Sequence, residues 1–324
     1  MEVTILFLYI KNAQRTKMAI VWYLSSVEFS NKTLVSGVLL RKKPSISNPG
    51  NSSFRNALMI IDSYFNTAYS KRNIVVKLMG ERIKIQTDSH GGFQVLFDFC
   101  SDQEVAIFEE TGSTSLEVIQ NYPIRFINSE SSISIISDID DSIMVSYTKT
   151  KVKRFLTTLL KPSHQRKVIP FTQELYQKYK QNGARFFYVS KSECNLMPTI
   201  SNFISHNGLP QGNLFLTPYL SLWQLISTSK DKNFKFKVIR DILENSPIQD
   251  FILIGDDSQR DMEIYTKIVQ KYPSKIKKVY IRQTQNKLNR KKMRSWEYLK
   301  ETGVDAYYFK LEEIFSKTIK TDES

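Results

Sequence analysis

Residues 133–143 constrain the fold of this 324-residue chain more than any other segment. They begin as a short apolar run of β-branched residues, which predicts a buried strand, and then carry Asp138, Asp140 and Asp141. In open parallel sheets, ligands bind at the carboxyl ends of the strands. Three carboxylates at such an end repel one another unless a cation neutralises them or some stay protonated. This segment alone favours a metal site and an ordinary acidic turn about equally.

Strand and helix patterns alternate in the rest of the chain. Apolar runs at residues 184–189 and 251–254 predict buried strands that end in Ser190 and Asp256, respectively. Helical patterns cover residues 170–183, 235–245 and 263–272. This alternation predicts an α/β fold with a doubly wound parallel sheet. Because several of its strands end in acidic or hydroxyl groups, the sheet is expected to bear a crevice for phosphate and metal chemistry.

The N-terminal part of the chain has a different pattern. Strand signals dominate residues 1–130, beginning with an apolar run at 3–10 that is far shorter than a membrane-spanning helix. They predict a mainly-β, sandwich-like accessory domain without a catalytic set of residues. A catalytic domain is then expected over residues 131–286, with residues 287–324 forming a basic helical extension that packs on it.

Charge and cysteine content narrow the functional classes. The chain has 46 Lys and Arg residues against 32 Asp and Glu residues, a net charge of +14, which favours anionic partners. An acidic membrane surface and a phosphorylated substrate both fit, but nucleic acid is not expected because no motif for reading it is recognisable. Cys100 and Cys194 are far apart and form neither a zinc pattern nor a disulfide framework, which fits a reducing, cytoplasmic setting.

The motifs around these acids resemble a known family. The Asp138-x-Asp140 pattern resembles the first motif of the haloacid dehalogenase superfamily. Residues 132–283 are more specifically similar to the actin-patch-associated phosphatidate phosphatases and their bacterial relatives. The matching motifs occur in the family's order: SDIDDSI at 137–143, FYVS at 187–190, ILENSP at 242–247, FILIGD at 251–256, DMEIY at 261–265, KYP at 271–273 and YIR at 280–282. The resemblance implies a haloacid-dehalogenase-like catalytic domain.

The resemblance also implies catalytic roles. Asp138 would attack phosphorus as the nucleophile, while Asp140 would act first as general acid and then as general base. Ser190 would hydrogen-bond the phosphoryl group in transfer. Lys235 would balance the developing negative charge, with Lys237 as the alternative if the motif is displaced by two residues.

A metal site follows from the same resemblance. Asp138, Asp256 and a backbone carbonyl at Asp140 would hold Mg²⁺, and Asp261 would complete or orient this shell. Carboxylate and carbonyl oxygens are the ligands that this hard cation prefers. Asp261 has an alternative role as the N-terminal cap of the helix that follows it. The role of Asp257 stays open.

The sequence departs from the family pattern at four places, one of which is Ser142 in place of the common threonine. Lys191 replaces the glycine that usually follows the serine of the second motif, and residues 192–194 lack the expected Pro-Trp pair. The usual Gly-Asp-Ser-Gly motif is Gly-Asp-Asp-Ser at residues 255–258. The acids and the lysine are intact, so we expect the chemistry to survive. Lys191 places bulk and charge beside the phosphate and leaves the substrate open.

The sequence thus predicts a Mg²⁺-dependent phosphatase that works through a phosphoaspartate, with phosphatidate or another anionic phospholipid monoester as the favoured substrate. The alternatives are a phosphatase of soluble phosphomonoesters and a non-catalytic module that binds anionic lipid. Residues 149–161 combine an apolar helical stripe with flanking lysine and arginine residues. The stripe is expected either to pack on the sheet or to rest on an anionic membrane, and under both alternatives the basic residues predict peripheral membrane contact from the cytoplasm.

Overall fold

The computed structural model describes residues 19–44, 53–111, 113–128, 131–139, 170–227, 231–246, 249–257, 260–284 and 290–309. Three sequence predictions lie outside these ranges: the first strand at 3–10, the general acid Asp140, and the basic pattern at 149–161.

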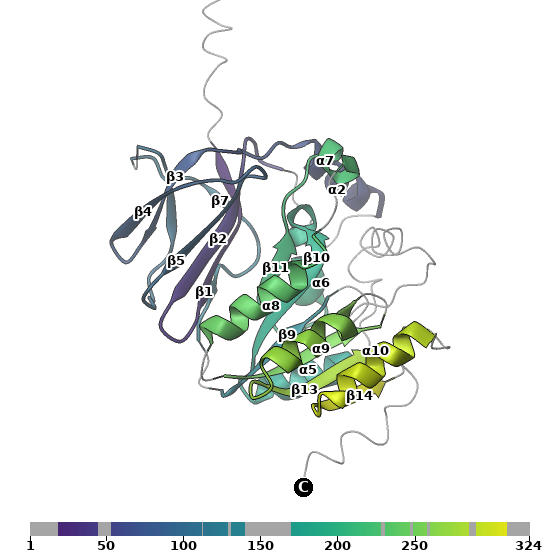
Figure 1. The fold of residues 1–324 in the computed structure, drawn as a ribbon. Coiled ribbons are helices and arrows are strands. Elements are labelled where there is room, and N and C mark those ends of the chain that lie inside the picture. The colour runs from purple at the N-terminus through teal and green to yellow at the C-terminus, as the bar shows by residue number, and fades with distance from the viewer. Residues whose placement is uncertain are drawn as a thin grey trace, which may run out of the picture.

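A six-stranded parallel sheet forms the centre of the C-terminal part (Figure 1). Its strands are β9 (Ile133–Ser137), β10 (Arg185–Glu193), β11 (Asn213–Thr217), β12 (Asp250–Asp256), β13 (Ile276–Arg282) and β14 (Asp305–Phe309). Their order across the sheet is β11-β10-β9-β12-β13-β14, and all neighbours pair in parallel. The predicted parallel α/β sheet is therefore confirmed. The direction of chain progress reverses between β9 and β12, and doubly wound sheets bind their ligands beside such a reversal.

Helices cover both faces of this sheet. Successive side chains of a strand point to opposite faces, so Ile135 and Ile136 of β9 enter different cores. Ile135 packs with α5 and α6, and Ile136 packs with α8, α9 and α10. The helices span Pro170–Gln181 (α5), Met197–His206 (α6), Leu222–Ser227 (α7), Phe234–Asn245 (α8), Asp261–Lys271 (α9) and Arg290–Glu301 (α10), and a 3₁₀ turn (η2) covers Cys194–Leu196. Within the described ranges, no helix is long and apolar enough to cross a membrane.

The N-terminal part contains two further sheets. The larger has the order β5-β2-β1-β7, with β8 also pairing with β1, and the smaller has the order β4-β3-β6. Their strands are β1 (Ile20–Glu28), β2 (Thr33–Leu40), β3 (Asn73–Leu78), β4 (Glu81–Gln86), β5 (Gly92–Phe97), β6 (Ala106–Glu109), β7 (Val118–Ile119) and β8 (Arg125–Phe126), and α2 spans Ser53–Phe65. The sequence analysis did not predict β1, because Ser25, Ser26 and Glu28 follow its short apolar run, although all nine of its residues are buried.

Strand β1 contributes side chains to three cores. Val21 and Leu24 belong to the core between the two N-terminal sheets, whereas Trp22 and Tyr23 belong to the core on the α5–α6 face of the parallel sheet. Polar contacts reinforce this junction. The guanidinium of Arg185 on β10 donates to the Glu28 carbonyl at 2.7 Å, and the Trp22 indole donates to the Cys194 carbonyl at 3.4 Å. Val27 of β1 belongs to the core on the other face of the parallel sheet, so the N-terminal strands pack directly on this sheet and contribute to both of its cores.

Residues 287–324 were predicted to form a helical extension, but their described part contains a strand as well as a helix. Helix α10 packs on α9, but β14 then pairs in parallel with β13 and becomes the edge strand of the main sheet. A domain boundary at residue 286 would therefore divide one sheet. Strand β14 has only five residues, and four of them are partly or fully exposed. Such a short edge strand carries little of the apolar pattern by which buried strands are detected.

Candidate functional site

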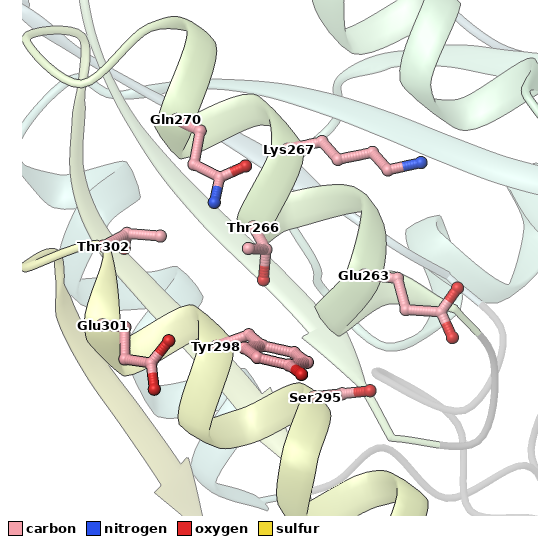
Figure 2. Close-up of a pocket in the computed structure, with 8 residues that line it drawn as sticks. All are labelled: Glu263, Thr266, Lys267, Gln270, Ser295, Tyr298, Glu301 and Thr302. Atoms are coloured by element: carbon pink, nitrogen blue, oxygen red, sulfur yellow. The ribbon is translucent and has the colours of Figure 1, made fainter.

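The described surface has a groove of about 540 Å³ between α9 and α10 (Figure 2). Its lining consists of Glu263, Thr266, Lys267, Gln270, Ser295, Tyr298, Glu301 and Thr302. None of these is a residue to which the motifs assign a catalytic or metal-binding role. We therefore locate the candidate site from the chemistry of its side chains and not from the volume of this groove.

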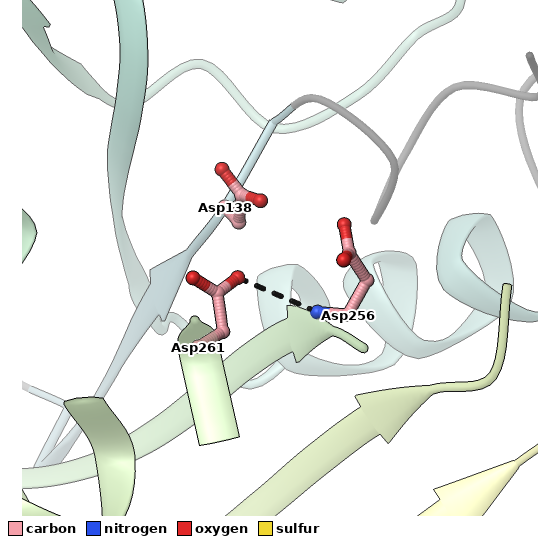
Figure 3. Close-up of side chains that lie close together, drawn as sticks. All are labelled: Asp138, Asp256 and Asp261. Atoms are coloured by element: carbon pink, nitrogen blue, oxygen red, sulfur yellow. Dashed lines mark hydrogen bonds between the residues drawn. The ribbon is translucent and has the colours of Figure 1, made fainter. Parts of the chain in front are cut away.

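Three predicted acids meet where the parallel sheet reverses direction. Asp138 follows β9, Asp256 ends β12, and Asp261 begins α9 (Figure 3). One carboxylate oxygen from each lies within 4.8 Å of the other two. All three side chains are buried, with no more than 1% exposure. The structure thus brings three carboxylates from separate elements into one water-poor cluster.

Backbone pairing holds Asp138 beside β12. Ser137 pairs with Ile254, and the Asp138 amide then donates to the Ile254 carbonyl at 2.9 Å. The Ile139 amide donates to Asp138 Oδ1 at 2.9 Å, and the Ser137 hydroxyl donates to the Asp138 carbonyl at 2.7 Å. These bonds fix both the backbone and the carboxylate of Asp138.

Lys235 is the cation of this cluster. Its side chain is 1% exposed, and Nζ lies 2.9 Å from Asp138 Oδ1 and 2.7 Å from Asp261 Oδ1. Burial on its own lowers the pKa of Lys235, but the two carboxylates outweigh burial and raise that pKa well above its usual value. Lys237 lies elsewhere: it is exposed and pairs with Asp231 at 2.9 Å. Of the two lysines, Lys235 is the one at the cluster.

Asp261 is placed by α9 but does not cap it. The residue at the N-cap is Arg260, and its side chain makes no capping bond. The carboxylate of Asp261 instead accepts from Lys235 through Oδ1 and from the Asp256 amide through Oδ2, at 2.7 and 3.5 Å. The first turn of a helix also favours a negative charge. The position of Asp261 thus fits a role in the cluster better than a capping role.

Ser190 and Lys191 follow at the same edge of the sheet. Tyr188 pairs with Ser137, so Ser190 lies two residues beyond this pair on β10, and it is fully buried. Its hydroxyl accepts from the Ser192 amide at 2.9 Å. Lys191 is half-buried, and its pKa is lowered by burial and by the positive charge of Lys235. Lys191 is therefore close enough to the cluster for the charges there to affect its pKa.

Asp257 is the buried acid whose role the sequence left open. It is 2% exposed but is not among the described carboxylates that form the cluster. Tyr308 and Lys292 contact its two oxygens at 2.6 and 3.0 Å. Burial acts to raise the pKa of Asp257, but hydrogen bonds from Thr284, Tyr308 and Lys292 outweigh it and lower that pKa. Sequence reasoning missed these partners because they lie far along the chain.

The cluster has the composition of a divalent-cation site. When ionised, the three carboxylates and the Lys235 ammonium sum to a charge of −2. Uncompensated charge is costly in a buried position, and a divalent cation would neutralise it. The available ligands are oxygens, which suit magnesium. Asp138, Asp256 and Asp261 therefore fit the predicted metal.

The cluster depends on a close approach at Gly255. A Cβ atom built on Gly255 would lie 2.8 Å from Asp261 Oδ2 and 2.9 Å from the Tyr265 ring. We expect Gly255→Ala to displace Asp261, to destabilise the fold by about 1–3 kcal/mol through overpacking, and to weaken Mn²⁺ binding. Chemical unfolding and calorimetric Mn²⁺ titration would measure the two effects. Wild-type values in both would show that the space beside Gly255 is not restrictive.

Comparisons with known proteins show which family residues 133–283 resemble. Residues 133–283 match the family model described as the catalytic domain of phosphatidate phosphatase APP1. The chain is 28% identical over 173 residues to phosphatidate phosphatase APP1 of Saccharomyces cerevisiae, covering 53% of this chain and 29% of that protein. It is also 28% identical over 157 residues to an uncharacterized Schizosaccharomyces pombe protein, covering 46% and 25%. The predicted resemblance to this family is confirmed for residues 133–283, although the chain spans less than a third of either relative.

Solved structures show weaker likeness. A class C acid phosphatase from Bacillus anthracis, crystallised with tungstate, aligns at 13% identity and a TM-score of 0.30, covering 45% of this chain and 65% of that one. A carbohydrate acetylesterase from Xanthomonas citri aligns at 7% identity and a TM-score of 0.27, covering 88% and 66%.

Proposed function

We propose that this chain is a magnesium-dependent phosphatase that acts through an aspartyl-phosphate, with phosphatidate or another anionic phospholipid monoester as its favoured substrate. The observation that carries the proposal is the buried cluster of Asp138, Lys235, Asp256 and Asp261 at the reversal point of the sheet. The cluster lies within the range that matches the phosphatidate phosphatase family, which supports the choice of substrate.

In the first step, a carboxylate oxygen of Asp138 attacks phosphorus. A bond from this oxygen to phosphorus forms while the bond from phosphorus to the substrate alcohol breaks, and Asp140 donates a proton to the departing oxygen. The Ile139 amide and Lys235 hold the attacking carboxylate in a fixed orientation through Oδ1. Such fixed positioning lowers the barrier because less motion is lost on reaching the transition state.

In the second step, water removes the phosphoryl group. Asp140 accepts a proton from water, the water oxygen bonds to phosphorus, and the bond to Asp138 breaks to release inorganic phosphate. Lys235 is already oriented towards Asp138 and balances negative charge in both steps. Magnesium held by Asp138, Asp256 and Asp261 would supply additional positive charge against the phosphate oxygens. Ser190 would hydrogen-bond the same phosphoryl group.

Membrane contact is part of the proposal. The net charge of +14 supports attraction to an anionic surface, as a lipid substrate requires. We place the protein in the cytoplasm with peripheral access to membranes.

A phosphatase screen with and without chelator tests this function. We expect Mg²⁺ or Mn²⁺ to support phosphate release from phosphatidate in mixed micelles, and exhaustive chelation to reduce the rate by about 100-fold or more, because the carboxylate cluster then lacks its counter-charge. Readdition of Mg²⁺ should restore the rate.

The substrate panel separates the alternatives. A soluble sugar phosphate and an aryl phosphate are included beside phosphatidate, and free phosphate is measured in each case. Full activity after chelation would show that the metal site is wrong. Faster hydrolysis of the soluble esters would favour the soluble-substrate alternative. Lipid binding without any phosphate release would favour the non-catalytic module.

A further inference from the structure

Asp257 joins the end of β12 to segments that lie later in the chain. Its Oδ1 accepts from the Thr284 amide at 2.9 Å and from the Thr284 hydroxyl, and it lies 3.0 Å from Lys292 Nζ on α10. Its Oδ2 accepts from the Tyr308 hydroxyl on β14 at 2.6 Å. One buried carboxylate thus binds three separate segments, and both of its oxygens are engaged.

These partners lie beyond the family match. The match ends at residue 283, whereas Thr284, Lys292 and Tyr308 all follow it. A carboxylate can accept several hydrogen bonds at once, and a charged donor such as Lys292 makes a stronger bond than a neutral one. The contacts of Asp257 with Thr284, Lys292 and Tyr308 therefore form one structural feature.

The position of Asp257 links this feature to the metal site. Successive side chains at the end of a strand point to opposite sides, so Asp256 enters the cluster while Asp257 faces α10 and β14. The Asp257 amide donates to the Arg282 carbonyl at 3.0 Å, which holds the backbone to β13. Through its side chain, Asp257 also contacts Lys292 on α10 and Tyr308 on β14. The amide and the side chain of Asp257 therefore both fix the backbone next to Asp256, which orients the Asp256 carboxylate.

We propose that Asp257 is a positioning residue that uses Lys292 and Tyr308 to lock the Asp256 carboxylate in its metal-binding orientation. The α10–β14 unit is then part of the metal site and not an appendage to it. This inference rests on the proposed function, because it assigns Asp256 to a cation. Asp257 itself is not among the described carboxylates that come together in the cluster, and its oxygens accept hydrogen bonds from Thr284 and Tyr308 instead.

Direct binding of Mn²⁺, followed by calorimetry in the intact chain, tests the proposal. The informative variant is Tyr308→Phe, which removes one hydroxyl and keeps the ring that stacks on Trp296 at 5.1 Å. Its matched control is Tyr307→Phe, on the same strand, where the hydroxyl donates to the exposed carboxylate of Asp305 at 3.2 Å. A second pair is Lys292→Met and Lys291→Met, because Lys291 is 80% exposed.

We expect Tyr308→Phe and Lys292→Met to weaken Mn²⁺ binding by about tenfold, as is usual for residues that support metal ligands, and both controls to bind like wild type. Asp257→Asn should weaken it at least as much. Thermal unfolding shows whether each variant is folded. Folded Tyr308→Phe and Lys292→Met with wild-type affinity would overturn the positioning role alone. No Mn²⁺ binding by the wild type would overturn the metal site, and with it both this role and the proposed function.

Discussion

Replacing Asp138 with asparagine is expected to lower turnover by about 10⁴-fold or more and to leave the fold intact. The amide has the same shape as the carboxylate, so the bond from the Ile139 amide to this side chain can be kept. It is a poor nucleophile and carries no charge for a cation. The variant should therefore fold but accumulate no phosphoenzyme.

The free energy of unfolding of Asp138→Asn shows whether a loss of turnover reflects lost chemistry or a damaged fold. Asp138→Asn removes one of three clustered negative charges, while Lys235 keeps its 2.7 Å contact with Asp261. We expect the free energy of unfolding to stay close to the wild-type value in the absence of metal. Steady-state phosphate release, quenched-flow mass measurement of the phosphoenzyme and urea unfolding would be compared. A near wild-type rate in protein free of contaminating phosphatase would exclude Asp138 as the nucleophile.

Replacing Lys235 with methionine should give the largest loss of stability in this site. The variant leaves Asp138 and Asp261 buried without the cation that contacts both. Removing one partner of a buried ion pair typically costs about 3–5 kcal/mol. Activity should fall by about 100-fold or more, because the charge near the reacting phosphoryl group is lost. Lys237→Met is the matched control on the same helix, since Lys237 is exposed and pairs with Asp231.

The pH dependence of this loss has a defined sign. The pKa of Lys235 is raised in the folded protein, so its contribution to stability is complete at neutral pH and fades only above its ordinary pKa of 10.5. In Lys235→Met, the clustered negative charges repel one another without the lysine, and acidic conditions weaken this repulsion. The stability deficit should therefore be largest near pH 7 and smaller near pH 5. Urea unfolding at both pH values measures it, and equal stability of both lysine variants would contradict the assignment of Lys235.

The sequence by itself determined the parallel sheet and the ends of its strands. The short apolar runs before Asp138 and Asp256 and the helical periods between them are local patterns, and they specify buried strands and amphipathic helices. Because parallel strands present their carboxyl ends at one edge, these two acids were expected to lie together, as the structure shows. The roles of Asp140 and Ser190 stay predictions. Strand β1 was missed because Ser25, Ser26 and Glu28 follow its short apolar run, and only the packing of the N-terminal sheets on the parallel sheet buries them.

The tertiary structure alone decided which distant groups meet. Lys235 and Lys237 share one helical pattern, but residues two apart lie about 200° apart around a helix, so only the packing of α8 places Lys235 at Asp138. Asp257 and Tyr308 are 51 residues apart, and their bond forms because β14 joins the far edge of the sheet. Periodicity encodes the secondary structure of a segment, whereas such contacts depend on how separate segments pack.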